Sequence, residues 1–243
     1  MSRSPDRPPV RLGVLVLQTR FSRLPGDAGN ASTWPVPVLF RVIAGGRPDA
    51  VVRGLKERSD LLEAFVEGAR ELESAGVELI TTTAGFFALH QRELQRRLAT
   101  TVLTSGLLQV PWLASTLPPG SRVGILSMEA VSLTDEHLRG CGIGPELPIA
   151  VQGLEEVGGH CNSVFIGDLA ELDPARAEAE HVEAGRRLVS RHADVAAIVL
   201  QSNAMPPYAH AIAAATGRPV YDLVTLVEWV LSGRLRQPFR ERG

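Results

Sequence analysis

The sequence predicts an α/β protein made of two pseudo-symmetric lobes, each a mostly parallel sheet flanked by helices, with an active-site cleft between them. Two apolar runs, residues 12–17 and 195–200, lack polar alternation, which is typical of parallel strands covered on both faces. A polar turn follows each run. The order strand, turn, loop, helix, strand, turn, helix occurs on both sides of Pro118-Pro119-Gly120. We therefore expect one lobe to comprise 10–118 plus 219–243 and the other to comprise 119–218.

The first half alternates apolar strands with helical spacing. Residues 1–10 are polar and proline-rich, and we expect them to be disordered. The segment 24–48 is rich in Gly, Pro and Asn and reads as a long loop. A stripe of apolar residues predicts a helix over 60–75, which Gly76 ends. The remaining predicted elements are strands at 12–17, 38–43, 77–83 and 101–104, a helix with His90 and Glu93, and a helix at 106–117.

The second half repeats this pattern. Its elements are strands at 122–128, 148–151, 195–200 and 219–221, and helices at 134–139, 174–192, 206–216 and 223–231, with a loop at 158–161. Pro206 suits the first turn of its helix, where the missing N–H has no intrahelical partner. Ser202 and Asn203 then lie at the carboxyl end of a strand, where open α/β sheets bind ligands. The alternative is an ordinary polar turn.

Composition excludes several classes of protein. The formal net charge is −2, which gives no general attraction to nucleic acid or to an anionic membrane. The arginines near the C-terminus are expected to form a solvated tail. Cys141 and Cys161 are too few for a disulfide framework, and the run 12–17 is too short for a signal peptide or a membrane span. We expect a cytoplasmic protein without a metal site, a Walker motif or a dinucleotide fingerprint.

Four segments resemble the aspartate/glutamate racemase superfamily, whose members include hydantoin racemases, maleate isomerases and arylmalonate decarboxylases. They are Thr81-Thr82-Thr83-Ala84-Gly85-Phe86, Val123-Gly124-Ile125-Leu126, Asn203-Ala204-Met205-Pro206-Pro207-Tyr208 and Tyr221-Asp222-Leu223-Val224-Thr225. The resemblance extends from Leu12 to about Leu231. It implies two lobes, a small-molecule substrate, no cofactor and a homodimer.

The resemblance also implies that each of two opposed turns supplies a cysteine for proton transfer. Those positions fall on Ala84 and Ser202, so both thiols are missing. A serine hydroxyl is a far weaker acid than a thiol, whose pKa near 8.5 can be tuned to neutrality. Racemisation by two thiols is therefore not expected of this chain.

Other residues are candidates for the remaining chemistry. Ser202, His160 and Cys161 are the catalytic candidates, because histidine suits proton transfer at neutral pH and Cys161 could be a relocated thiol. A solvated loop histidine is the alternative for His160. The substrate-binding candidates supply hydroxyl, amide, charged or backbone groups, and are Arg20, Thr82, Thr83, Ala84, Gly85, Glu129 and Asn203. Helix capping is the alternative for Thr82, and a surface salt bridge is the alternative for Arg20.

Two hypotheses about function follow. In the first, the chain is a cofactor-independent enzyme that acts on a small carboxylate or carbonyl compound through a stabilised enolate or carbanion. Isomerisation, elimination, cyclisation and decarboxylation all fit, because each can pass through such an intermediate. In the second, it is a pseudoenzyme that binds a related ligand or a protein partner without turnover.

Overall fold

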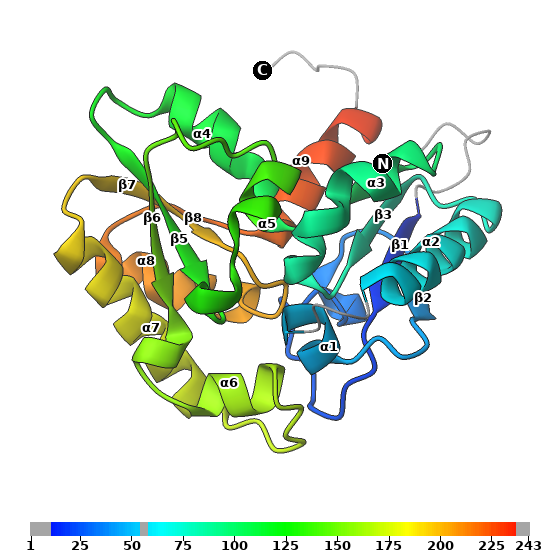
Figure 1. Cartoon of the computed structure of the whole chain (residues 1–243), viewed down its shortest axis with the longest axis horizontal. Helices are drawn as coiled ribbons and strands as arrows, with labels where there is room; N and C mark the ends of the chain where they lie inside the picture. Colours follow the sequence, from blue (N-terminus) through cyan, green and yellow to red (C-terminus); the bar gives the residue numbers. More distant parts are fainter. Residues whose placement is uncertain (1–10, 54–57, 237–243) are drawn as a thin grey trace, which may run out of the picture.

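Two parallel sheets of the same topology form the core, in a computed structural model that describes residues 11–53 and 58–236 (Figure 1). The first sheet has the order β2-β1-β3-β4 and the second has the order β6-β5-β7-β8. Every strand pair is parallel. The strands are β1 (Leu12–Val16), β2 (Val38–Val42), β3 (Leu79–Thr82), β4 (Thr101–Leu103), β5 (Arg122–Ser127), β6 (Ile149–Gly153), β7 (Val195–Leu200) and β8 (Val220–Tyr221). The predicted fold class is confirmed.

Helices flank both sheets, as parallel connections require. The α-helices are α1 (Pro48–Arg53), α2 (Arg58–Ser74), α3 (Gln91–Arg96), α4 (Val110–Thr116), α5 (Asp135–Gly140), α6 (His160–Phe165), α7 (Pro174–Arg191), α8 (Ala209–Thr216) and α9 (Leu223–Arg234). The turns after β3 and β7 continue as short 3-10 helices, η2 (Gly85–His90) and η6 (Pro206–Tyr208). Gly76, with a φ of 76°, follows α2 as predicted. None of the described helices is both long and apolar enough to cross a bilayer.

Two parts of the chain differ from the prediction. The expected loop at 158–161 is in part a helix, because α6 begins at His160. The Glu180 carboxylate of α7 accepts the backbone N–H groups of His160 and Cys161 at 3.0 and 2.8 Å, which caps α6. A capping group twenty residues away leaves no local sequence signal. The predicted disorder of 1–10 lies outside the described residues, as do Arg240 and Arg242 of the predicted basic tail. Arg234 of that tail is the last residue of α9 and pairs with Glu78 at 3.3 Å.

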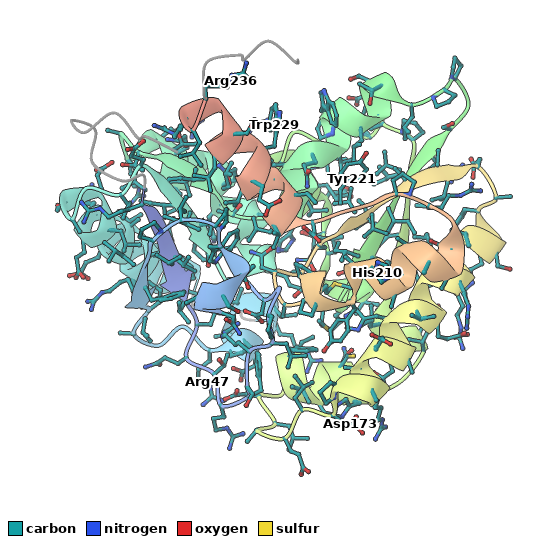
Figure 2. The ribbon with its side chains drawn as sticks, turned by 180° about the vertical axis from the view of Figure 1, so that it is seen from behind. Arg47, Asp173, His210, Tyr221, Trp229 and Arg236 are labelled. Carbon is teal, nitrogen blue, oxygen red and sulfur yellow. The ribbon has the colours of Figure 1, made fainter. Side chains whose placement is uncertain are left out.

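The segment expected in the first lobe after residue 219 divides between the lobes. Strand β8 pairs with β7 in the second sheet, with Ile198 opposite Val220. Helix α9 then crosses back and packs through Leu223 and Leu226 on Leu12 and Leu79 of the first lobe (Figure 2). The strand was too short for the sequence to indicate its partner. The other domain boundaries remain a prediction.

The lobes meet where the carboxyl ends of β3, β4 and β7 come together. A Cβ atom added to Gly85 would lie 2.2 Å from the backbone oxygen of Gln201, and one added to Gly106 would lie 2.8 Å from that of Leu200. The Ser105 hydroxyl donates to the Gln201 oxygen at 3.1 Å. Only glycine permits this approach at position 85.

We expect Gly85→Ala to destabilise the protein by about 2 kcal/mol or more, because the added methyl group cannot fit against a backbone oxygen. Urea denaturation monitored by circular dichroism measures the change. Gly159→Ala is the matched control, since a Cβ there meets nothing within 4 Å. Equal stabilities of the two variants would show that the lobes separate at little cost.

Candidate active site at the junction of the two lobes

The two turns predicted to face each other are in direct contact. In the structure, Gly85 packs against the backbone of Gln201 and Ser202. Within Thr82–Gly85 and Gln201–Ala204, every residue is buried except Ser202, which is partly exposed. Ala84, at the first expected thiol position, has an exposed fraction of 3% and packs on Leu17 and Phe87. Ser202 is therefore the accessible polar side chain of the two turns.

The predicted threonines shape the turns. Thr83 Oγ1 accepts the backbone N–H of Leu17 at 2.9 Å, which ties the end of β1 to the end of β3. Thr82 Oγ1 accepts the N–H of Ala84 at 3.1 Å. Both threonines are buried, so in this conformation they position the first turn. For Thr82 this matches the alternative to substrate binding, in which its hydroxyl caps the turn.

Asn203 joins the lobes through its amide group. Its Nδ2 donates to the backbone oxygens of Thr82 and Thr104 at 2.7 and 2.9 Å. Both N–H bonds are thus committed to the other lobe. The buried Oδ1 has no hydrogen-bond partner among the described residues, so it is the atom of this side chain that could still accept one from a ligand.

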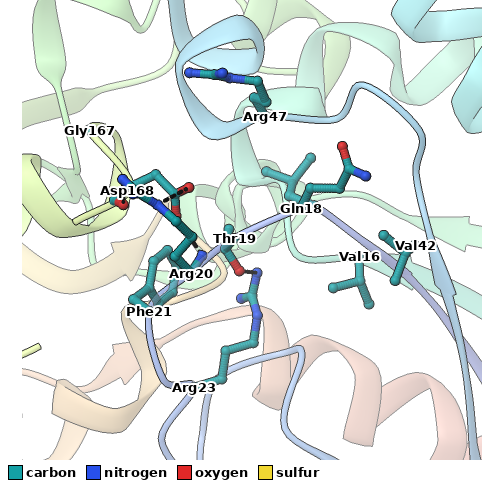
Figure 3. Close-up of a pocket in the computed structure, with 11 residues that line it drawn as sticks. Val16, Gln18, Thr19, Arg20, Phe21, Arg23, Val42, Arg47, Gly167 and Asp168 are labelled. Carbon is teal, nitrogen blue, oxygen red and sulfur yellow. Dashed lines mark hydrogen bonds and ion pairs between the residues drawn. The ribbon is translucent and has the colours of Figure 1, made fainter. Parts of the chain in front are cut away.

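Beside the turns, a pocket of about 910 Å³ opens at the carboxyl end of β1. Its lining combines apolar side chains with the three arginines Arg20, Arg23 and Arg47 (Figure 3). The other lining residues are Val16, Leu17, Gln18, Thr19, Phe21, Val42, Gly167 and Asp168. Leu17 connects this pocket to the first turn, because Thr83 accepts its N–H. Arg20 pairs with Asp168 of the second lobe at 3.2 Å.

The arginine beneath the pocket is held by a buried carboxylate. Arg23 Nη1 donates to both oxygens of Asp27, at 2.8 and 3.1 Å, and Nη2 donates to Thr19 Oγ1 at 3.1 Å. Burial raises the pKa of Asp27, while Arg23 opposes that rise. No local sequence pattern indicates this pair within the long loop.

Glu129, predicted to bind substrate, lies in an ion pair between the lobes. The Arg53 guanidinium of α1 donates to both of its carboxylate oxygens, and the Ser132 hydroxyl donates as well. The hydrogen bond from Arg53 lowers the pKa of Glu129. An anionic carboxylate held in this way is a poor general base near neutral pH.

His160 and Cys161 lie at the contact of α6 with α7. His160 Nε2 accepts the N–H of Asp173 at 3.0 Å. The Cys161 thiol is fully buried, with Sγ 3.6 Å from Nδ1 of His181. Burial raises the pKa of Cys161 far above its ordinary value, so it supplies no thiolate near neutral pH. None of the described hydrogen bonds connects either residue to the two turns, and their catalytic role remains a prediction.

Two buried polar side chains beside Cys161 were not among the predicted site residues. The rings of His181 and Tyr208 stack with centroids 4.1 Å apart. His181 Nδ1 donates to the Ala177 oxygen at 2.7 Å, whereas His181 Nε2 and the Tyr208 hydroxyl have no partner among the described residues. Tyr208 belongs to the Pro-Pro-Tyr motif, but a buried histidine on a long amphipathic helix has no distinctive pattern. Within residues 11–53 and 58–236, no cluster of His, Cys, Asp and Glu could bind a metal ion.

This architecture is the fold of amino-acid racemases and arylmalonate decarboxylase. An aspartate racemase from Picrophilus torridus superposes with a TM-score of 0.60 and 13% identity, covering 95% of this chain and 96% of that one. A variant of arylmalonate decarboxylase with associated sulfate gives 0.56 at 14% identity, over 93% and 92% of the two chains. A glutamate racemase from Francisella tularensis in complex with D-glutamate gives 0.55 at 15% identity, over 95% and 84%.

Among curated proteins, the chain is similar to dimethylsulfoniopropionate lyases. It is 27% identical to one from Durusdinium sp. clade D, over 97% of this chain and 79% of that protein. It is 26% identical to lyase 7 of Emiliania huxleyi, over 93% and 68%. No family model matches the chain. The resemblance to the racemase superfamily is thus confirmed in the fold, and the relatives support an enzyme of the isomerase or lyase kind.

Truncation of the amide that joins the lobes should be costly. We expect Asn203→Ala to lower the free energy of unfolding by about 2–4 kcal/mol, because it leaves two backbone oxygens without their donor. Chemical denaturation measures the loss. Asn162→Ala is the control, since its Oδ1 already has no partner among the described residues. A loss no larger than that of the control would contradict a joining role.

Burial of His181 should make stability depend on pH. Desolvation lowers its pKa from 6.5 to about 4, so between these values the unfolded chain binds a proton that the folded chain excludes. The free energy of unfolding should therefore fall by roughly 3 kcal/mol at most as the pH drops from 7 to 4. His181→Phe should remove this part of the dependence, whereas His210→Gln, at an exposed position, should retain it. An unchanged slope in His181→Phe would refute the assignment.

Proposed function

We propose that the chain is a cofactor-independent lyase that generates a stabilised enolate at the carbon next to the carboxylate of a small substrate, by elimination or by decarboxylation. The observation that carries the proposal is the exposure of Ser202 between two otherwise buried turns. The similarity to dimethylsulfoniopropionate lyases and the fold shared with arylmalonate decarboxylase support this class of reaction. The substrate's carboxylate would bind at the arginine-lined pocket beside β1.

The residues of the two turns favour one-sided chemistry. Racemisation needs a proton-transfer group on each face of the reacting carbon, and Ala84 offers none. In an elimination, one base removes the proton, the carbon–carbon double bond forms, and the leaving group departs with its bonding electrons. In a decarboxylation, carbon dioxide leaves without any base, and the carbanion takes one proton from a donor. Both reactions need stabilisation of the enolate oxygen more than they need a second acid.

Ser202 would supply that stabilisation. Among the described residues its hydroxyl accepts one long hydrogen bond, at 3.5 Å from the Ala204 N–H, so its proton can be donated to an enolate oxygen. A preorganised donor of this kind can contribute roughly 3–4 kcal/mol in a transition state. The backbone N–H groups at the start of η2 add donors without intrahelical partners, whereas η6 begins with Pro206 and Pro207, which have no N–H.

The alternative function is ligand binding without turnover. It is favoured by the burial of Ala84 and of the Cys161 thiol, which leaves the junction without a thiolate. A pseudoenzyme of this kind would keep the arginine-lined pocket and lose only the proton chemistry.

Activity assays on matched variants test the proposal. The wild-type protein is assayed for release of dimethyl sulfide from dimethylsulfoniopropionate and of carbon dioxide from phenylmalonate. We expect turnover of at least one substrate, and a fall of tenfold or more in kcat for Ser202→Ala, which loses the donor. Ser115→Ala, on an exposed helix position, is the control and should leave kcat unchanged.

The same assays identify the alternative. Turnover that survives Ser202→Ala would refute the role of Ser202. A wild-type protein that binds both compounds but converts neither, while the double variant Ala84→Cys/Ser202→Cys gains racemase activity, would establish the pseudoenzyme.

A further inference from the structure

The pocket beside β1 contains a carboxylate supplied by the opposite lobe. Asp168 follows α6 in the second lobe, whereas Arg20 follows β1 in the first. The Arg20 backbone N–H donates to Asp168 Oδ1 at 2.7 Å, and Arg20 Nε donates to Oδ2 at 3.2 Å. Arg20 Nη2 also donates to the Asp168 backbone oxygen at 2.5 Å. A backbone N–H and a guanidinium that converge on one carboxylate form a complete carboxylate-binding site.

The other two arginines of the pocket have partners from their own lobe. Arg23 is held by the buried Asp27 and by Thr19, so its guanidinium is fixed in place. Arg47 pairs with Asp49 at 3.1 Å, two residues along the chain. In Figure 3 the Arg47 guanidinium is directed toward the side of the pocket on which Asp168 lies. Arg20 is thus the arginine of this pocket whose carboxylate comes from across the junction.

The pair is placed for exchange with a ligand. The Arg20 and Asp168 side chains have exposed fractions of 67% and 22%, and ion pairs open to solvent contribute little to stability. Asp168 has a φ of 56°, the one positive φ outside glycine in the described residues. Aspartate tolerates this left-handed conformation better than most residues, but less well than glycine. Removing the carboxylate from Arg20 therefore costs the fold little.

We propose that Asp168 is an internal competitor for the substrate: its carboxylate occupies the Arg20 site, and a ligand carboxylate binds by taking its place. This inference deepens the proposed function, on which it rests for the class of ligand. It makes Arg20 the residue that selects carboxylates. It also makes Asp168 an autoinhibitory group that sets how strongly they bind.

Binding of propionate to the full-length protein tests the proposal, with propionamide as the neutral analogue. We expect Asp168→Asn to bind propionate at least tenfold more tightly than the wild type by isothermal titration calorimetry, with no change for propionamide. Asp168→Gly, which permits the left-handed backbone, should show the same gain. Adding Arg20→Gln to Asp168→Asn should abolish it.

Asp49→Asn is the matched control, because it makes the same change of charge beside Arg47 of the same pocket. We expect it to alter propionate binding less than threefold. Equal gains in Asp49→Asn and Asp168→Asn would show an effect of net charge alone and would overturn the proposal, as would a gain that survives Arg20→Gln. Since calorimetry needs no turnover, tighter binding by an inactive protein would support this inference while the proposed lyase activity fails.

Discussion

The contact between Gly85 and the backbone of Gln201 is the constraint on which the arrangement of the junction depends. It brings the carboxyl ends of β3 and β7 together with no side chain between them. The Asn203 amide then fixes their spacing through the oxygens of Thr82 and Thr104. Gly85, Gln201 and Asn203 act through backbone contact and hydrogen bonds. Because hydrogen bonds are directional, the two turns are held in one relative orientation. Ser202 is thereby left as the residue of the two turns whose side chain is accessible to a ligand.

Charge is distributed across the junction in a consistent direction. Arg20 and Arg53 come from the first lobe, and their partners Asp168 and Glu129 come from the second. The pairs flank the turns instead of entering them. The neutral junction and its charged surroundings are thus separate features, the first suited to an uncharged reacting carbon and the second to the ionised end of a small acid.

Much of the fold could be predicted from the sequence because buried parallel strands and their turns leave a local pattern. Val195–Leu200 was predicted with the bounds it has in the structure, and the repeated layout predicted that the turns after β3 and β7 face each other, which the contact of Gly85 with Gln201 and Ser202 bears out. The features that escaped depend on distant partners. Glu180 caps α6 from another helix, and β8 pairs with the second sheet through a strand of only two residues. Asp168 binds Arg20 although the two residues are 148 positions apart in the sequence. Arg20 and Glu129 were predicted as substrate-binding residues, but only the structure reveals the carboxylate of Asp168 and the guanidinium of Arg53 that bind them.

The path of β8 and α9 has a consequence for the stability of the two lobes. The chain leaves the first lobe after α4, completes the second sheet with β8, and returns as α9 to cover Leu12 and Leu79. Neither half of the polypeptide therefore has a complete core of its own. A fragment that ends near Pro118 would expose the apolar face that α9 covers, and the remaining fragment would contain α9 without the surface on which it packs. Because β8 belongs to the second sheet and α9 packs on the first lobe, this segment couples the two lobes. We therefore expect them to unfold in one cooperative transition despite their similar topology.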